Sequence, residues 1–179
     1  MKLMGKTVYL DTLEREDCRA LWQATEWDID NLTEEPGLGL SVEKADEWFE
    51  EIQRLQRNRH IRLGIFLEDG RVIGDAALQN LDYRNRCCSV GIGIARLADR
   101  AKGYGGQALD LLLKYGFHCL GMERITANTL EVNAGSRRLL ETHGFLLEGR
   151  ERKAVYLNGQ KYDRLCYGLL REEYEAGAK

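Results

Sequence analysis

Apolar residues recur along the chain with two spacings, and each spacing predicts a kind of secondary structure. A spacing of three to four residues, typical of one face of a helix, runs through four segments. These segments are residues 14–27, 41–55, 105–120 and 134–143. Ser41 stands where a helix N-cap is expected, and Gly121 and Gly144 follow the last two segments as stop signals. We therefore predict four helices.

Alternating apolar and polar residues, or short apolar runs, predict strands between these helices. The strand segments are residues 8–10, 61–67, 72–81, 88–95, 124–130, 145–157 and 162–170. Asp69-Gly70 and Asn158-Gly159 are typical of tight hairpin turns. The order of elements predicts a single α/β domain with a mixed sheet. The charged tail from Arg171 onward is expected to fray.

Composition and charge exclude several classes of protein. The 179 residues are 44% hydrophobic and 31% charged with one proline, as in an ordinary globular domain. A net charge of −3 leaves no overall basic field, so a nucleic-acid partner is not expected. No segment is long and apolar enough to span a bilayer, and the first ten residues do not resemble a secretory signal. These features predict a cytoplasmic protein without a membrane partner.

Cysteine and histidine spacings argue against a metal site. The five cysteines are odd in number and contain no CxxC spacing, so reduced thiols are the simplest interpretation. Cys87 and Cys88 are adjacent, and a strained disulfide between neighbours is disfavoured. None of the three histidines pairs with another at ligand spacing. We therefore expect no metal.

A glycine-rich turn precedes the strongest helix and predicts an anion site. Arg100 and Lys102 supply positive charge, and Gly103, Gly105 and Gly106 let the backbone approach a ligand. The first turn of a helix presents unpaired N–H groups and a positive dipole end, which suits phosphate oxygens. The alternative is a turn that only reverses the chain. The turn matches neither a Walker loop nor a Rossmann fingerprint.

The pattern R-x-x-G-x-G at Arg100 to Gly105 resembles the pyrophosphate turn of the GNAT superfamily of N-acetyltransferases. The resemblance covers about residues 8–170. Residues 91–94 resemble the strand that pairs with pantetheine, and residues 133–145 are similar to the N-x-x-S…GF segment. Residues 147–167 resemble the closing hairpin. Within the superfamily, the order resembles the branch of ribosomal-protein alanine and spermidine acetyltransferases.

The resemblance implies one N-acetyltransferase domain over residues 1–179. It implies a mixed, largely antiparallel sheet flanked by helices, with acetyl-CoA as co-substrate. A backbone N–H near Gly93 to Ala95 would polarise the thioester carbonyl, and Asn133 would bond pantetheine or nearby backbone. The implied acetyl-CoA-binding residues are Gly93, Ile94, Ala95, Arg100, Ala101, Lys102, Gly103, Tyr104, Gly105, Gly106, Asn133 and Ser136.

The chain departs from the family pattern where proton transfer is expected. Many members carry a tyrosine seven residues after the asparagine, but Leu140 stands there and cannot donate a proton. Ser136 is then the candidate catalytic donor to the leaving thiolate, and a serine that only bonds helix-start backbone is the open alternative. Ser89 replaces a carboxylate often found in its strand. Asp75 faces the cleft or is an exposed strand residue, and the second interpretation is favoured.

The acceptor pocket is the least determined part. Glu34-Glu35-Pro36 resembles the acidic loop of spermidine acetyltransferases, which makes Glu34 and Glu35 the candidate substrate-binding residues. A solvated acidic loop is the favoured alternative, and the missing tyrosine counts against a polyamine enzyme. Trp27 lies at the mouth of the pocket or in the core.

The leading hypothesis is transfer of acetyl from acetyl-CoA to a primary amine, on a protein N-terminus or a small molecule, by direct attack. The alternatives are a polyamine acetyltransferase and a catalytically inactive CoA-binding sensor or interaction module. The family resemblance also implies a homodimer.

Overall fold

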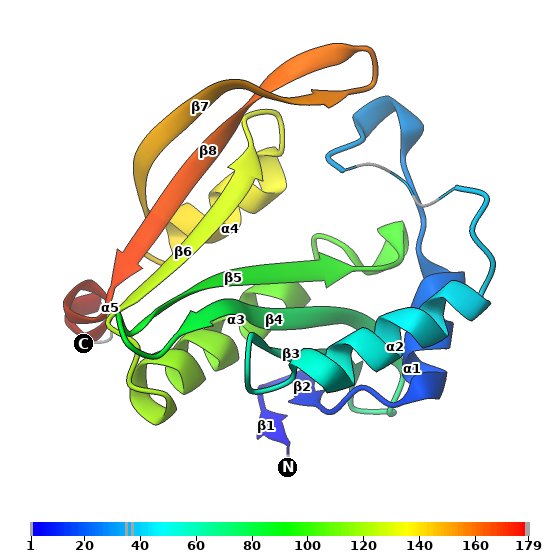
Figure 1. Cartoon of the computed structure of the whole chain (residues 1–179), viewed down its shortest axis with the longest axis horizontal. Helices are drawn as coiled ribbons and strands as arrows, with labels where there is room; N and C mark the ends of the chain where they lie inside the picture. Colours follow the sequence, from blue (N-terminus) through cyan, green and yellow to red (C-terminus); the bar gives the residue numbers. More distant parts are fainter. Residues whose placement is uncertain (1, 35, 37, 178–179) are drawn as a thin grey trace.

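The computed structural model describes residues 2–34, 36 and 38–177. Within these residues, eight strands form one sheet in the order β1-β2-β3-β4-β5-β6-β8-β7 (Figure 1). The strands are β1 (Leu3–Met4), β2 (Val8–Asp11), β3 (His60–Leu67), β4 (Val72–Asp82), β5 (Cys87–Ile94), β6 (Arg124–Leu130), β7 (Leu146–Leu157) and β8 (Gln160–Leu170). Neighbours are antiparallel except β5 and β6, which are parallel. The predicted α/β fold with a mixed, largely antiparallel sheet is confirmed.

The predicted helices form, with shifted ends. They are α1 (Arg15–Ala24), α2 (Glu43–Leu55), α3 (Tyr104–Lys114), the π-helical η3 (Tyr115–Cys119) and α4 (Ala134–Thr142), with short 3-10 turns at η1 (Ile29–Asn31) and η2 (Leu97–Asp99). Helix α2 begins after Val42, so the N-cap predicted at Ser41 is wrong by one residue. Helix α1 ends at Ala24, because Thr25 takes an extended conformation. Gly121 and Gly144 have positive φ angles of 67° and 84°, as helix stops require.

The C-terminal segment corrects one expectation. Instead of a frayed tail, residues Arg171–Gly177 form helix α5. The ring of Tyr174 stacks on Phe117 of η3 with centroids 4.9 Å apart. The Arg171 Nε donates to Glu175 Oε1 at 2.8 Å along the helix. The charged composition of the segment did not predict this docking, because the stacking partner is distant in sequence.

Two hydrophobic clusters cover opposite faces of the sheet. The larger joins α3 to the central strands and includes the fully buried Leu109, Leu112 and Ile65. The smaller joins α1 and α2 through Cys18 and Ile52. Figure 1 shows α1 and α2 in front of the sheet and α3 behind it. Burying each large side chain contributes about 1.5–3 kcal/mol, so both clusters stabilise the packing of helices on the sheet.

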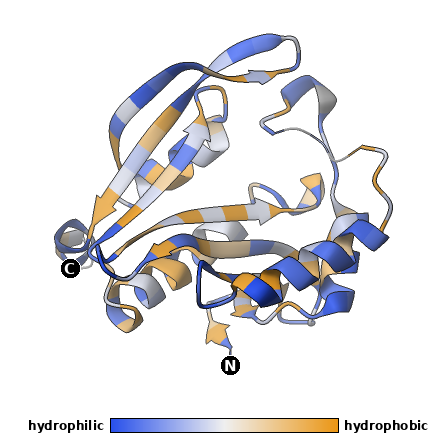
Figure 2. Ribbon diagram, in the orientation of Figure 1, coloured by the Kyte–Doolittle hydropathy of each residue, from blue (hydrophilic) through white to orange (hydrophobic). Residues whose placement is uncertain are grey.

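The sheet opens in its middle, and this opening positions the site. Strands β5 and β6 pair only at three positions, from Cys87↔Arg124 to Ser89↔Thr126. Beyond them both strands continue without pairing to each other, so a wedge forms between Val90–Ile94 and Ala127–Leu130. At the far edge of the sheet, β7 is almost entirely exposed, and the hydrophilic colour prevails along it in Figure 2. No helix in the described residues is long and apolar enough to cross a membrane.

Candidate functional site

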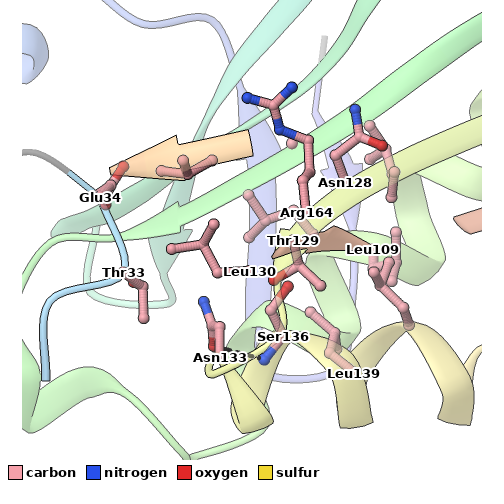
Figure 3. Close-up of a pocket in the computed structure, with 16 residues that line it drawn as sticks. Thr33, Glu34, Leu109, Asn128, Thr129, Leu130, Asn133, Ser136, Leu139 and Arg164 are labelled. Carbon is pink, nitrogen blue, oxygen red and sulfur yellow. Dashed lines mark hydrogen bonds between the residues drawn. The ribbon is translucent and has the colours of Figure 1, made fainter. Parts of the chain in front are cut away.

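The wedge between β5 and β6 leads into two adjoining cavities of about 420 Å³ and 1450 Å³. The α1–α2 connection forms one wall of the larger cavity, and the tip of the β7–β8 hairpin and the start of α4 contribute to others. Both cavities share the lining residues Thr33, Glu34, Ile92, Asn133, Ser136 and Leu139 (Figure 3). Three distant parts of the chain therefore meet at one site.

The glycine turn at the start of α3 lines the larger cavity. Ala101 and Gly103 have left-handed φ angles of 59° and 82°, and α3 begins at the next residue, Tyr104. A Cβ at Gly103 would meet nothing within 4 Å, and one at Gly105 would meet only Ile92, at 3.9 Å. The space beside Gly103 and Gly105 is therefore open, and the first-turn N–H groups of a helix lack intrahelical partners, a combination that suits an anion.

Arg100 ties this turn to the end of β5. Its Nε donates to the carbonyl of Ile94 at 3.1 Å, and its Nη2 donates to the carbonyl of Glu26 at 3.4 Å. The Glu26 carboxylate in turn accepts from the backbone N–H of Leu97 at 2.8 Å. The guanidinium therefore shapes the turn as well as adding positive charge to the cavity. Glu26 belongs to the acidic connection in the sequence, but in the structure its carboxylate and its carbonyl bind Leu97 and Arg100.

The backbone groups at the end of β5 are unequal. The N–H of Ala95 donates to the carbonyl of Ile73 at 3.0 Å, so it is not available to a ligand. Successive amides of a strand point to opposite edges, so the N–H of Ile94 points towards the β6 side, into the wedge. Of the three residues Gly93, Ile94 and Ala95, the geometry favours Ile94 as the donor to a group bound there.

Asn133 and Ser136 lie at the start of α4, and the structure separates their roles. Asn133 is the N-cap, and its Oδ1 accepts from the backbone N–H of Ser136 at 3.0 Å. Figure 3 shows the Asn133 amide nitrogen and the Ser136 hydroxyl directed into the pocket. Leu140 is only 4% exposed and packs in the core, so it fills no catalytic position.

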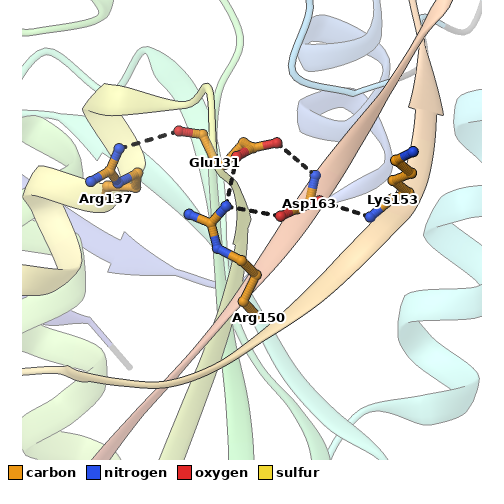
Figure 4. Close-up of polar contacts among 5 residues, drawn as sticks. All are labelled: Glu131, Arg137, Arg150, Lys153 and Asp163. Carbon is orange, nitrogen blue, oxygen red and sulfur yellow. Dashed lines mark hydrogen bonds and ion pairs between the residues drawn. The ribbon is translucent and has the colours of Figure 1, made fainter.

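A polar network that sequence reasoning missed holds the turn before α4 against the closing hairpin (Figure 4). Arg150 of β7 donates to Glu131 at 3.0 Å and to Asp163 of β8 at 2.8 Å. Asp163 also accepts from the backbone N–H of Lys153 at 2.7 Å, inside the irregular part of β7. Arg137 of α4 donates to the carbonyl of Glu131 at 3.3 Å. The network couples the hairpin to the segment that carries Asn133.

The acidic connection contributes fewer free carboxylates than its composition suggests. Asp28 caps η1, with its carboxylate accepting from Asp30 N at 3.2 Å and Asn31 Nδ2 at 2.8 Å. Glu34 borders both cavities, and Glu35 lies outside the described residues.

Glu34 is an exposed residue, but desolvation of its carboxyl group raises the pKa of that group. The nearby Arg100 opposes that rise. Trp27 lines the larger cavity and is not a core residue.

Asp75 corrects an expectation. The sequence favours an exposed strand residue, but the Asp75 side chain is 21% exposed, pairs with Arg62 and lines the larger cavity beside Trp48. Its position on β4 places it on the face that α1 and α2 cover, which local sequence does not reveal. Burial raises the pKa of the Asp75 carboxyl, and Arg62 opposes this. Among the described residues, no group of acidic, histidine or cysteine side chains is arranged to hold a metal ion.

Residues 7–146 match a family model described as an acetyltransferase (GNAT) domain. YjcK of Bacillus subtilis, named as an N-acetyltransferase, is 30% identical over 97% of this chain and 99% of its own length. YdaF of the same organism, named as a ribosomal N-acetyltransferase, is 37% identical over 61% of this chain, and the match spans 59% of YdaF. The solved structure of RimL, a ribosomal L7/L12 alpha-N-protein acetyltransferase, in complex with coenzyme A has a TM-score of 0.84. It is 20% identical and covers 95% of this chain and 98% of its own, so the likeness concerns the fold.

Proposed function

Because this chain belongs to the acetyltransferase (GNAT) family and is an acetyl-CoA-dependent enzyme that acetylates a primary amine, we propose that its acceptor is a protein N-terminus. The observation that carries this proposal is the wide cavity in which few carboxylates are free. Of the carboxylates that line the larger cavity, Asp28 is bound within η1, Asp75 pairs with Arg62 and Asp99 pairs with Arg71. A long polycation would therefore meet mainly Asp30 and Glu34. The name of YdaF, a ribosomal N-acetyltransferase, supports the same acceptor class.

The glycine turn is the proposed site for the diphosphate of acetyl-CoA. The backbone amides of Gly103 to Gly106 would hold its oxygens, with Arg100 of the cavity wall adding positive charge. Lys102, which does not line the cavity and lies 3.9 Å from Asp99, would add charge nearby. The open space at Gly103 and Gly105 supports this fit. Arg100→Glu would place a negative charge beside the diphosphate. We expect calorimetry to show at least tenfold weaker CoA binding, and unchanged affinity would refute the assignment.

The reacting end lies in the wedge between β5 and β6. The bound acetyl-CoA supplies an electrophilic thioester carbonyl and a thiol leaving group. The N–H of Ile94 would donate to the carbonyl oxygen, where negative charge develops. The amide of Asn133 would bond the pantetheine arm, and the Ser136 hydroxyl would donate a proton or hydrogen bond to the leaving sulfur. Holding the amine and the thioester together provides much of the remaining acceleration.

A cytoplasmic homodimer formed by one domain per chain, over residues 1–179, is the proposed working state. Strand β7 is an exposed edge, and its residues Leu146 and Leu147 are 57% and 56% exposed. Such an edge is open to pairing with a second copy. All five cysteines are free, as expected in a reducing compartment. Analytical ultracentrifugation tests the proposal, and a monomer at micromolar concentration would refute it.

A thiol-release screen with acetyl-CoA tests the acceptor. The panel contains peptide amides beginning with alanine and serine, together with spermidine, free amino acids and an aminoglycoside. We expect turnover with at least one peptide, at a kcat/KM at least tenfold above that for spermidine. Preference for spermidine would instead indicate a polyamine enzyme. Binding of CoA without thiol release from any amine would indicate a sensor, and absence of CoA binding would remove both assignments.

A further inference from the structure

Asp75 lies directly beside the part of β5 that faces the reacting end of the site. Asp75 and Gly93 are register partners across the antiparallel pair β4–β5. A Cβ placed on Gly93 would stand 3.3 Å from Asp75 Oδ1, so the carboxylate covers the position where any other residue would carry a side chain. The absence of a side chain at Gly93 therefore lets this carboxylate approach the strand closely. The same carboxylate borders the larger cavity.

The carboxylate of Asp75 is held in place by Arg62 of β3. The two side chains form an ion pair, and they are 21% and 20% exposed respectively. Arg62 is itself fixed, because its backbone N–H donates to Gln56 Oε1 at 3.0 Å and its carbonyl accepts from Gln56 Nε2 at 3.1 Å. Its guanidinium lies 6.0 Å from the ring centroid of Trp48 on α2. Arg62 thus fixes the position of the half-buried Asp75 carboxylate on β4.

The charged and titratable groups around Asp75 come from three elements. Arg62 of β3 favours its ionised form, and Glu34 of the α1–α2 connection is a second carboxylate close enough to interact with it. Cys18 of α1 also interacts with Asp75, but burial raises the pKa of its thiol to about 12, so it is neutral at pH 7. Burial raises the pKa of Asp75 itself, and Arg62 limits the rise. A carboxyl group with a raised pKa holds a proton more strongly than an ordinary aspartate, as a proton acceptor requires.

Other side chains fit the role of a proton acceptor less well. The hydroxyl of Ser89 accepts from Asn80 Nδ2 at 3.0 Å and donates to the Gln79 carbonyl at 3.3 Å, so it is engaged with β4. Glu34 lies in the irregular α1–α2 connection and is an exposed residue. Among the described residues, only Asp75 combines a strand position, a place on the cavity surface and a carboxylate that covers the Cβ position of Gly93.

We propose that Asp75 is the catalytic base that takes the proton from the acceptor ammonium, with Arg62 as its positioning residue. This inference rests on the proposed amine acetylation. The ammonium gives one proton to the carboxylate and becomes a neutral amine. The amine nitrogen then forms a bond to the thioester carbonyl carbon, and the carbon–sulfur bond breaks. The departing sulfur and the second nitrogen proton together yield free thiol and amide, and Asp75 releases its proton to solvent.

Steady-state kinetics of Asp75→Asn, with acetyl-CoA and the alanine and serine peptide amides, test the role. Loss of a general base costs about 10²–10⁴-fold, so we expect kcat to fall at least 100-fold. The Kd for acetyl-CoA should change less than twofold. Glu68→Gln, an exposed carboxylate in the β3–β4 turn, is the matched control and should retain wild-type kcat. An Asp75→Asn variant with kcat within threefold of wild type would overturn the proposal.

The Arg62→Gln variant tests whether Arg62 acts on the Asp75 carboxylate or only supports the fold. Removing the guanidinium raises the pKa of Asp75, because Arg62 lowers it. The acidic limb of the kcat/KM profile, where rate rises as the base loses its proton, should therefore move to higher pH. An unmoved limb would refute the link between the two residues.

The pKa of Asp75 can be measured without turnover, so this test does not depend on knowing the acceptor. The carboxyl carbon of Asp75 can be titrated by nuclear magnetic resonance in the CoA-bound protein, with Asp75→Asn to assign the signal. We expect its midpoint to lie above the ordinary aspartate value of about 3.9. A midpoint at or below that value would overturn the proposal. If the wild-type protein acetylates no amine in the panel, the proposed acceptor class is refuted. The titration still tests separately whether the Asp75 carboxyl has the raised pKa that the proposal requires.

Discussion

Asp99 and Arg71 form a two-point ion pair below the glycine turn. Arg71 Nη1 lies 2.7 Å from Asp99 Oδ2, and Nη2 lies 3.2 Å from Oδ1. Asp99 is only 5% exposed, although Arg71 reaches solvent. The pair connects the start of β4 to η2, and Lys102 lies 3.9 Å from the same carboxylate. The conformation of the glycine turn thus depends on a contact with the β3–β4 turn.

Asp99→Asn should lower the free energy of unfolding by about 2 kcal/mol. Breaking a fully buried pair costs about 3–5 kcal/mol, and the solvent exposure of Arg71 reduces that figure. Urea denaturation at pH 7 measures the change, with Glu68→Gln as the control for a charge lost from an exposed turn. A loss below 0.5 kcal/mol would show that the pair does not stabilise the turn.

The same pair predicts how stability depends on pH. The hydrogen bond from Arg71 lowers the pKa of Asp99, and the charges of Arg71, Lys102 and Arg96 act in the same direction. A depressed folded-state pKa contributes stability above the unfolded value of about 3.9, and this contribution is lost as pH falls through the folded value. The stability difference between wild type and Asp99→Asn should be constant from pH 5 to 8 and shrink below about pH 4. A difference that stays constant down to pH 2 would contradict the assignment.

Asn133→Ala and Ser136→Ala should affect different properties. Asn133 caps α4 with its side chain, so its removal should cost about 1 kcal/mol of stability. Ser136 donates to the Asn133 side chain through its backbone N–H. Ser136→Ala keeps that hydrogen bond and should change stability by less than about 0.5 kcal/mol. If the Ser136 hydroxyl serves the leaving sulfur, kcat should fall about 10²-fold. Thermal unfolding and thiol-release assays on the same preparations check both parts, and an unchanged kcat for Ser136→Ala would remove its catalytic role.

Gly74→Ala should disturb the strand pair beside the site. A Cβ at Gly74 would clash with the backbone carbonyl of Gly93, which no side-chain rotation can relieve. Overpacking of this kind costs about 1–3 kcal/mol. We also expect weaker CoA binding, because β5 must move. Gly149→Ala, where a Cβ meets nothing within 4 Å, is the matched control and should leave CoA affinity unchanged. Equal effects of the two substitutions would contradict this interpretation.

Much of the local structure could be predicted from the sequence. The spacing of apolar residues predicted the helices and strands within a few residues, because one buried face imposes its period on the chain. The glycine turn and the Asn133–Ser136 segment were also predicted as site residues, and both lie on the cavity wall. Both segments could be predicted because the residues that form each of them are close together in the chain.

The remaining features depend on contacts between distant segments. The cleft-facing position of Asp75 requires Arg62 and the packing of α1 and α2, and the docking of α5 requires Phe117. The carboxylates of Glu26 and Asp99 look like surface charges in the sequence, yet each is used by a backbone or side-chain partner elsewhere. The sequence by itself determined the elements and the glycine turn before α3, because those follow from local periodicity and backbone freedom. Only the tertiary structure decided which carboxylates are free in the cavity, because ion pairing and burial arise when separate elements pack together.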